Sequence, residues 1–161
     1  MSHDAQLRPL PHGDEWLHLD RQLCFALYAS SLAMTKLYKP LLAPLGLTYP
    51  QYLVMLVLWQ DGTSSVSALG ERLSLDSGTL TPLLKRLELA GHVTRARDPG
   101  DERRVQVALT ACGHALKTQA LALPTTLACA TSCDLAELQS LTQRLHDLLG
   151  RLRRASVTNP A

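Results

Sequence analysis

The sequence has few aromatic residues and little net charge. Phe, Trp and Tyr make up 4% of its 161 residues, and there is a single phenylalanine, so a core must be built mainly from leucine and alanine. The formal net charge is only +2. Bulk charge therefore gives no argument for a nucleic-acid partner, and such a function would have to rest on where individual cations are placed.

Long apolar runs are also missing. No stretch approaches the roughly 20 apolar residues of a membrane span, and the N-terminal segment with Asp4, Asp14 and Glu15 has no apolar signal-peptide core. We therefore expect a cytoplasmic protein with no membrane partner. In that reducing compartment, the four cysteines are expected to serve packing, redox chemistry or metal binding rather than structural disulfides.

The stretch 67–109 carries the most informative pattern. Its middle has a leucine stripe at helical spacing, which predicts a helix with one buried face, and Ser77 stands where an N-cap would be. A shorter helix over 67–73, capped by Ser67, precedes it across a tight turn, so the pair predicts a helix-turn-helix. The leucines of the stripe are Leu80, Leu83, Leu84 and Leu87.

The opposite face of this second helix is polar. Small and hydroxyl side chains come first, near the helix N-terminus, where free N–H groups and the helix dipole attract phosphate oxygens. Gly78 would allow close approach to DNA, and Pro82 could touch a thymine methyl. The candidate DNA-binding residues of this face are Ser77, Gly78, Thr79, Thr81, Pro82, Lys85 and Arg86.

A hairpin is predicted after Gly91, which should end the helix. Two alternating runs flank the turn-rich, charged segment 98–104, and a hairpin beside a helix-turn-helix is typical of a DNA-binding wing. The alternative is an αα-hairpin with a surface hairpin and no nucleic-acid partner. The candidate DNA-binding residues of the wing are Arg97, Asp101, Arg103 and Arg104.

The remaining segments predict a mainly α fold with a small β wing. Residues 1–16 are expected to be a flexible arm, and 17–161 a single domain with 46% hydrophobic content available for its core. In it, long helices at 17–60 and 110–154 flank the winged helix-turn-helix at 64–109. Pro40 and Pro44 should break the first helix, and Thr110 should cap the helix after the wing.

The flanking helices carry more apolar surface than one small domain can cover. We therefore infer that they interlock two chains into a homodimer. Regulators with a helix-turn-helix bind palindromes as dimers, with half-sites about one helical turn apart.

The first helix places Cys24 among hydroxyl groups. Tyr28 is one turn away, whereas Tyr38 is 14 residues on, roughly 21 Å along a straight helix. Tyr38 could therefore reach only the Cys24 of an antiparallel partner chain. Hydrogen bonds from phenols stabilise a thiolate, the form that attacks a peroxide, and apolar walls favour an organic peroxide. The alternative is that Cys24 is a small buried hydrophobe and the tyrosines pack at an interface.

Two later cysteines, Cys129 and Cys133, share one face if their segment is helical. Either could resolve a sulfenic acid on Cys24 into a disulfide, or both could hold a metal with His146. Cys112 lies at a helix start beside the returning strand, where packing is the favoured role.

On these motifs the chain resembles the MarR family of winged-helix regulators, and within it the two-cysteine organic-hydroperoxide-resistance repressors. The resemblance covers about 17–152. Its motifs are the string 75–88, then Gly91, Asp98, Asp101-Glu102-Arg103 and Leu109-Thr110, together with the spacing Cys24, Tyr28, Tyr38 and Tyr49.

The resemblance implies a regulator rather than an enzyme, with no cofactor or metal. Cys24 would be the peroxidatic thiol, hydrogen-bonded by Tyr38 and Tyr49 of the other subunit, and Cys129 the resolving thiol of an intersubunit disulfide. The reduced dimer would repress from a palindromic double-stranded operator, and an organic hydroperoxide would release it. The rival hypotheses are a MarR-type regulator that senses a small phenolic ligand, and a thiol peroxidase or metal-binding module.

Overall fold

The computed structural model describes residues 14–158. They divide into two compact units, of which the first ends at Tyr49 and the second begins at Pro50. Most of the expected arm lies outside the described residues, and its last residues, Asp14–Trp16, belong to a short 3₁₀ helix.

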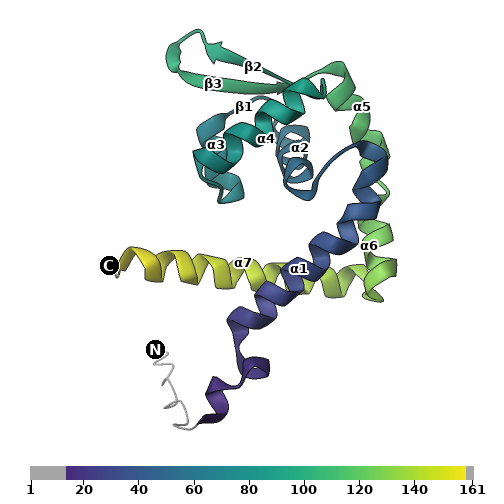
Figure 1. The fold of residues 1–161 in the computed structure, drawn as a ribbon, viewed down its shortest axis with the longest axis vertical. Helices are drawn as coiled ribbons and strands as arrows, with labels where there is room; N and C mark the ends of the chain where they lie inside the picture. The colour runs from purple at the N-terminus through teal and green to yellow at the C-terminus, as the bar shows by residue number, and fades with distance from the viewer. Residues whose placement is uncertain (1–13, 159–161) are drawn as a thin grey trace, which may run out of the picture. The chain divides into compact units, whose positions relative to one another are not determined.

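The first unit is built on helix α1, Leu23–Leu42 (Figure 1). The helix begins later than the expected Leu17, because 3₁₀ helices occupy Asp14–Leu17 and Leu19–Arg21. A break at Pro40 was wrong: Pro40 lies in the last turn, where its missing N–H costs one hydrogen bond, and the N–H of Ala43 still reaches the Lys39 carbonyl.

The end of the first unit is set by glycine. The 3₁₀ helix Ala43–Leu45 follows α1, and Gly46 then takes a left-handed φ of 67°. Its N–H donates to the Ala43 carbonyl at 3.0 Å, and the Leu47 N–H to the Leu42 carbonyl at 3.3 Å. These bonds satisfy carbonyls that the helix end would otherwise leave without partners.

The first three helices of the second unit are followed by the two longer strands of a small sheet and by three further helices. Helix α2, Tyr49–Asp61, is mostly buried, as its all-round apolar sequence predicts. Helices α3, Val66–Leu73, and α4, Ser77–Leu89, form the expected helix-turn-helix. All four leucines of the α4 stripe are buried.

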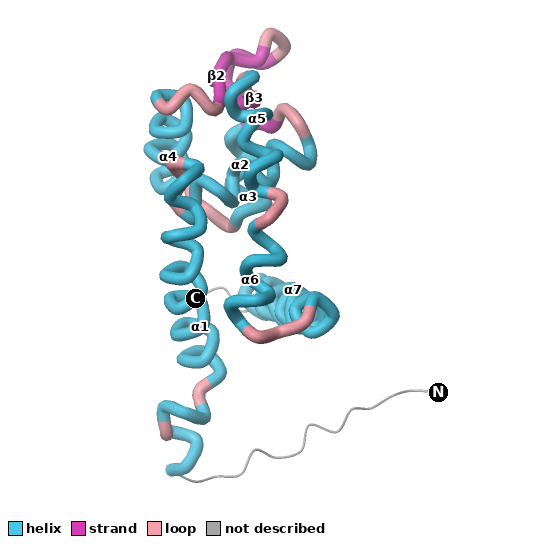
Figure 2. The backbone as a smooth tube through the Cα atoms, turned by 90° about the vertical axis from the view of Figure 1, so that its right-hand side faces the viewer, coloured by secondary structure: helices cyan, strands magenta, loops and turns pink. Residues whose placement is uncertain are grey.

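The sheet has three antiparallel strands in the order β1-β3-β2. They are β1, Ser64–Ser65, β2, Val93–Asp98, and β3, Asp101–Leu109. Strands β2 and β3 form a hairpin that projects from the helices of the second unit, shown in magenta in Figure 2. The expected fold class, mainly α with a β wing, is confirmed.

Three helices follow the hairpin. They are α5, Ala111–Ala120, α6, Leu123–Thr131, and α7, Leu135–Thr158. Thr110 caps α5 as expected, since its hydroxyl accepts the Gly113 N–H at 3.0 Å. Asp134 likewise accepts the Glu137 N–H at 2.7 Å at the start of α7.

Among residues 14–158, no single helix is long and apolar enough to cross a membrane. The consecutive helical segments Leu23–Leu45 and Tyr49–Asp61 reach the required length and composition only when they are taken together.

Candidate functional site

Helix α4, the second helix of the helix-turn-helix and the candidate recognition helix, is capped by Asp76 and not by Ser77. One carboxylate oxygen of Asp76 accepts the Thr79 N–H at 2.9 Å, and the other accepts the Thr79 hydroxyl at 2.8 Å. This hydroxyl is the main reason that the pKa of Asp76 lies below its ordinary value. Ser77 is therefore the first residue of the helix itself. The Thr79 hydroxyl donates its hydrogen bond to Asp76. Toward another partner, Thr79 therefore presents only a hydrogen-bond acceptor and its methyl group.

The cap of α3 is also displaced from the expected position. Ser65, at the end of β1, has extended backbone geometry, and its hydroxyl accepts the Ala68 N–H at 3.1 Å. Ser67 lies inside the helix. In the tight turn that follows, the Gly70 carbonyl accepts the Leu75 N–H at 2.9 Å. The turn requires glycine at this position, because a Cβ on residue 70 would lie 2.9 Å from the Leu75 carbonyl oxygen.

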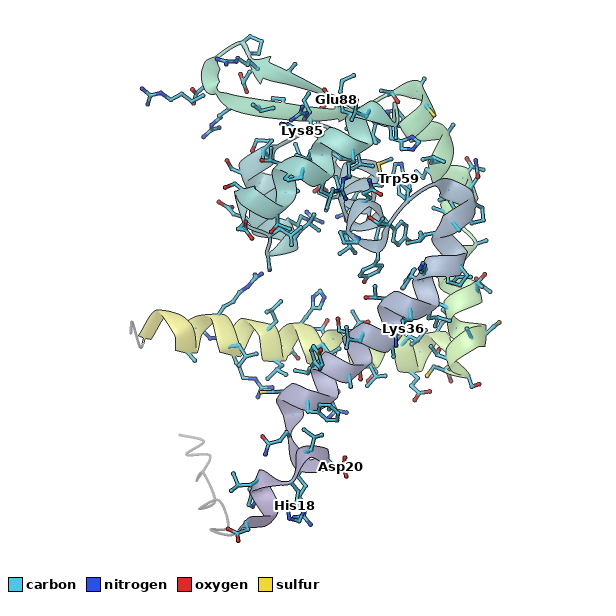
Figure 3. All side chains as sticks on the ribbon, in the orientation of Figure 1. His18, Asp20, Lys36, Trp59, Lys85 and Glu88 are labelled. Carbon is cyan, nitrogen blue, oxygen red and sulfur yellow. The ribbon has the colours of Figure 1, made fainter. Side chains whose placement is uncertain are left out.

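The polar residues of α4 lie opposite its leucine stripe, and Figure 3 labels Lys85 among them. All seven candidates are at least partly accessible, and only Thr81 is half-buried. The face therefore presents hydroxyl groups, a glycine, a proline and two cations to solvent. Such a face can meet both phosphates and base edges in a major groove.

The tip of the hairpin is held by two aspartates. The Asp98 carboxylate accepts the Gln106 amide at 2.7 Å and the Gly100 N–H at 2.8 Å, and these bonds lower the pKa of Asp98. Asp101 accepts the Arg103 main-chain N–H at 3.1 Å and lies 3.5 Å from the Arg104 guanidinium. Asp101 thus orders the tip, while the side chains of the candidate cations Arg97, Arg103 and Arg104 are exposed.

A contact that the sequence reasoning missed joins the recognition helix to the wing. Glu88, near the end of α4, accepts three hydrogen bonds from Arg95 of β2, at 3.1 Å from the main-chain N–H and at 2.9 and 2.6 Å from the guanidinium. The Arg95 bonds hold the pKa of Glu88 below its ordinary value. Figure 3 shows Glu88 beside the hairpin.

Two of the three phenols of the first unit, Tyr38 and Tyr49, are separated from Cys24 by most of α1, and the third, Tyr28, is close to it. Cys24 is the second residue of the helix and is exposed, and Tyr28 is exposed one turn later. Tyr38 lies near the other end, roughly 21 Å away at the standard helical rise. There its ring lies 4.9 Å, between centroids, from the ring of Tyr49. Burial raises the pKa of Tyr49 above its ordinary value.

The second unit carries the other three cysteines. Cys129 is exposed in the last turn of α6. Cys133 does not share a helical face with Cys129, contrary to the prediction for a continuous helix. Ser132 takes a left-handed φ of 55°, and α6 ends before Cys133. The Cys133 thiol is half-buried and contacts the Thr131 carbonyl at 3.5 Å. Cys112 is exposed, with its sulfur 3.8 Å from the His92 ring.

Metal binding finds no support in the part of the chain that the structure describes. There, no three His, Cys, Asp or Glu side chains gather where they could hold an ion. His146, the third ligand considered for Cys129 and Cys133, lies on α7.

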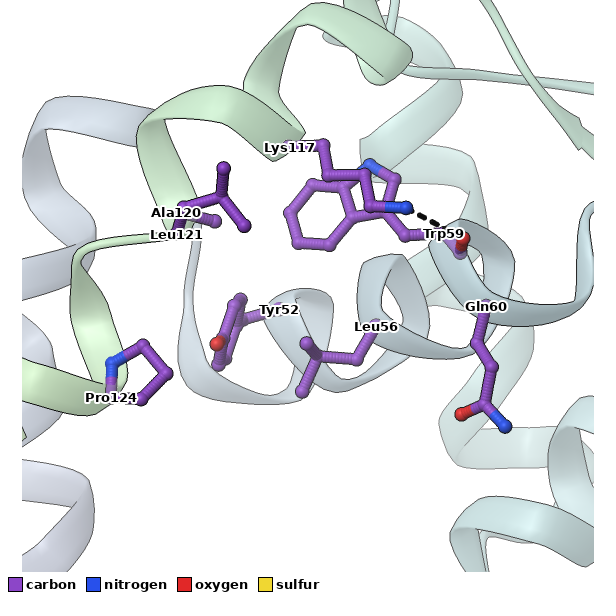
Figure 4. A pocket seen from close by; sticks show the side chains of 8 residues that line it. All are labelled: Tyr52, Leu56, Trp59, Gln60, Lys117, Ala120, Leu121 and Pro124. Carbon is purple, nitrogen blue, oxygen red and sulfur yellow. Dashed lines mark hydrogen bonds between the residues drawn. The ribbon is translucent and has the colours of Figure 1, made fainter. Parts of the chain in front are cut away.

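A pocket of about 520 Å³ opens between α2 and the α5–α6 segment (Figure 4). Tyr52, Leu56 and Leu121 are among the side chains that make its lining mainly apolar. Lys117 is a cation in the lining, and its ammonium group donates to the Trp59 carbonyl at 3.2 Å. A regulator that senses a small ligand would need a cavity of this kind.

Comparison with known proteins identifies relatives over most of the chain. The model of the MarR family matches residues 47–105. The HTH-type transcriptional regulator TtmR of Methylorubrum extorquens (strain PA1) is 50% identical over 150 residues, which are 92% of this chain and 77% of TtmR. The organic hydroperoxide resistance transcriptional regulator of Bacillus subtilis (strain 168) is 49% identical over 136 residues, 84% of this chain and 92% of that protein.

A solved structure, reduced AbfR bound to DNA, aligns with a TM-score of 0.70 and 33% identity. The alignment covers 88% of this chain and 96% of AbfR, a protein of Staphylococcus epidermidis. The resemblance found in the sequence is thus confirmed, and the two relatives that are about half identical align with 92% and 84% of this chain. This chain belongs to the MarR family of transcriptional regulators.

Proposed function

We propose that this chain is a redox-sensing transcriptional repressor that responds to organic hydroperoxides. The reduced homodimer binds a palindromic operator in the cytoplasm, with α4 in the major groove and the wing in the adjacent minor groove. Two similar proteins support this proposal: the Bacillus subtilis relative is a regulator of organic hydroperoxide resistance, and AbfR was solved in its reduced form bound to DNA.

The observation that carries the proposal is the continuity of α1. Because the helix is unbroken from Leu23 to Leu42, the Tyr38–Tyr49 pair cannot reach the Cys24 of its own chain. Two helices that run antiparallel in a dimer bring each pair to the partner's Cys24. The phenols then donate hydrogen bonds to the thiolate and stabilise the reactive form.

The chemistry of sensing takes two steps. The Cys24 thiolate attacks the terminal oxygen of the hydroperoxide, the O–O bond breaks, and the alkoxide leaves as an alcohol after it takes a proton. Sulfur is oxidised to sulfenic acid and the peroxide is reduced. Cys129 of the partner then attacks this sulfur, the S–O bond breaks, and a disulfide and water form. One peroxide switches one site, so the protein acts as a sensor and not as an enzyme.

The disulfide requires the two sulfurs to come within about 2 Å of each other. Cys129 lies on α6, a nine-residue helix with a break at each end, and a short element of this kind can shift relative to its neighbours. Its movement changes the separation of the two recognition helices. Because the half-sites have a fixed spacing, affinity for the operator falls.

The test is a gel shift before and after addition of cumene hydroperoxide. Wild type should bind and be released, whereas Cys24→Ser should bind and stay bound. Cys112→Ser is the control, because Cys112 is exposed and has no part in the proposed mechanism, and it should respond as wild type does. Release of Cys24→Ser by peroxide would overturn the proposal. Release of wild type by phenolic compounds alone would favour ligand sensing, and multiple turnovers of peroxide would favour a thiol peroxidase.

A further inference from the structure

The contact between Glu88 and Arg95 restrains the main chain of β2 as well as the side chain of Arg95. One Glu88 oxygen accepts the main-chain N–H of Arg95, and the other accepts two guanidinium N–H groups. The bond to the main-chain N–H restrains the position of the strand. The two guanidinium bonds restrain the rotation of the strand about that first bond. A single carboxylate therefore sets both the position and the tilt of β2 against α4.

Arg95 occupies the position where the hairpin leaves the body of the second unit. In the sheet it pairs with Val107, and directly opposite residues of an antiparallel pair share one face. On this face Val93 and Val107 are buried, Arg95 is half-buried, and Arg97 is exposed. Glu88 thus holds the hairpin at the edge of its packed base.

The wing beyond this point acts as a lever. Its tip, which carries Arg103 and Arg104, begins about three residues past Arg95, or roughly 10 Å along the strand. Over that length a tilt of about 10° moves the tip by nearly 2 Å, which is more than the range of hydrogen-bond distances allows. Small changes at the Glu88 contact are therefore large at the tip.

We propose that Glu88 is a positioning residue for DNA recognition, which sets the distance between the major-groove contacts of α4 and the minor-groove contact of the wing. The inference rests on the proposed function in that it requires operator binding by both elements. Glu88 itself touches no DNA in this proposal and acts through Arg95.

Charge provides a sharp test of this role. Removing a carboxylate near a polyanion should by itself strengthen binding, because repulsion of the phosphates is lost. If Glu88 positions the wing, Glu88→Gln should instead weaken it. Glu71→Gln is the matched control, because Glu71 is exposed on α3 of the same helix-turn-helix and undergoes the same change of charge.

The probe is a DNA duplex selected from a random library by the reduced wild-type chain. Hydroxyl-radical footprinting reports the central and flanking contacts separately, and a thermal melt reports folding. Glu88→Gln should keep the central protection and lose the flanking minor-groove protection, with affinity about tenfold lower, as when one arginine contact is lost. Arg95→Lys, which keeps the charge but lacks the forked donor, should lose the same protection. Glu71→Gln should keep both protections and bind at least as tightly as wild type.

Two results would overturn the inference: flanking protection that persists in Glu88→Gln, or central and flanking protection that fall together with the melting temperature, as expected of a purely structural contact. If the wild-type chain selects no duplex, the proposed function fails and this inference fails with it.

Discussion

The rings of Tyr38 and Tyr49 lie 4.9 Å apart between centroids, with their planes inclined at 41°. Tyr38 is on α1 and Tyr49 begins α2, so the turn at Gly46 brings the two phenols together. Burial raises the pKa of Tyr49 above its ordinary value, and at neutral pH this phenol is a hydrogen-bond donor. In the proposed mechanism the pair donates hydrogen bonds to the Cys24 thiolate of the partner, because α1 is too long for the pair to reach the Cys24 of its own chain.

Mixed dimers should show that the phenols act across the dimer. In one dimer, a chain with Cys24→Ser, Tyr38→Phe and Tyr49→Phe is paired with a wild-type chain, so the remaining Cys24 has no phenols from its partner. Its oxidation by cumene hydroperoxide should be about tenfold slower or more, the effect of losing hydrogen bonds to a charged group. Stopped-flow measurement of thiol loss gives the rate.

The control dimer distributes the same substitutions differently. A Cys24→Ser chain with both tyrosines is paired with a chain that has Cys24 and both Tyr→Phe changes. The remaining Cys24 then meets intact phenols from its partner and should react at the wild-type rate. Equal rates in the two mixed dimers would show that the phenols do not act in trans.

The two late cysteines should differ in forming the disulfide. Cys129 is exposed, whereas Cys133 is half-buried with its thiol against the Thr131 carbonyl. After treatment with peroxide, Cys133→Ser should still give a reducible dimer on a non-reducing gel, and Cys129→Ser should not. A dimer band that is lost only when Cys133 is changed would make Cys133 the resolving residue.

The sequence was most informative where one pattern has one physical reading. Leucines at helical spacing share one buried face only in a helix, and the predicted helix is present as α4 with its leucines buried. The predicted cap was right for Thr110 but wrong for α3 and α4, where Ser65 and Asp76 are the caps. Asp76 and Ser77 are both good capping residues, and only the local geometry selects one. The predicted break at Pro40 is absent, because a proline in the last turn of a helix removes only one hydrogen bond.

Contacts that form across element boundaries were not predictable. Glu88 and Arg95 are seven residues apart, on a helix and on a strand, and no periodicity joins them. Helix α6 ends before Cys133 because Ser132 has a left-handed backbone conformation. Serine rarely adopts this conformation, so the sequence did not predict it.

The Asp76 cap predicts how stability depends on pH. Its pKa is lowered in the folded chain, so the carboxylate stays charged there at a pH where the unfolded chain takes up a proton. The stability that this charge contributes is present above the ordinary pKa of 3.8 and is lost as the pH falls through the lower folded pKa. Asp76→Asn keeps a capping oxygen without the titration. Wild type should melt at a higher temperature than Asp76→Asn at pH 6, and this difference should shrink below pH 4. A difference that is constant with pH would contradict the prediction.

Two helical glycines should respond to alanine in opposite ways. A Cβ at Gly113, in α5, would lie 2.1 Å from the His92 carbonyl oxygen, a main-chain atom. Gly113→Ala should therefore cost about 3 kcal/mol or more of unfolding free energy through overpacking. At Gly150, in α7, the nearest atom is the end of Arg154 at 3.7 Å. Gly150→Ala should stabilise the chain by about 0.5–1 kcal/mol, since alanine loses less entropy in a helix. Urea denaturation measures both, and a neutral Gly113→Ala would mean that α5 shifts to accommodate the methyl group.

Lys85 should contribute to DNA affinity without contributing to sequence selection. It is exposed on the polar face of α4, past the first turn, and in the proposed complex its ammonium group neutralises a phosphate. Each phosphate that a cation neutralises adds about 0.9 to the slope of log affinity against log salt concentration. Lys85→Gln should therefore reduce that slope by about one and leave the affinity ratio between selected and altered duplexes unchanged. Lys36→Gln, the same change of charge at an exposed residue of α1, should leave the slope as it is in wild type. If Lys85→Gln instead changed the affinity ratio at one base pair, Lys85 would contact that base.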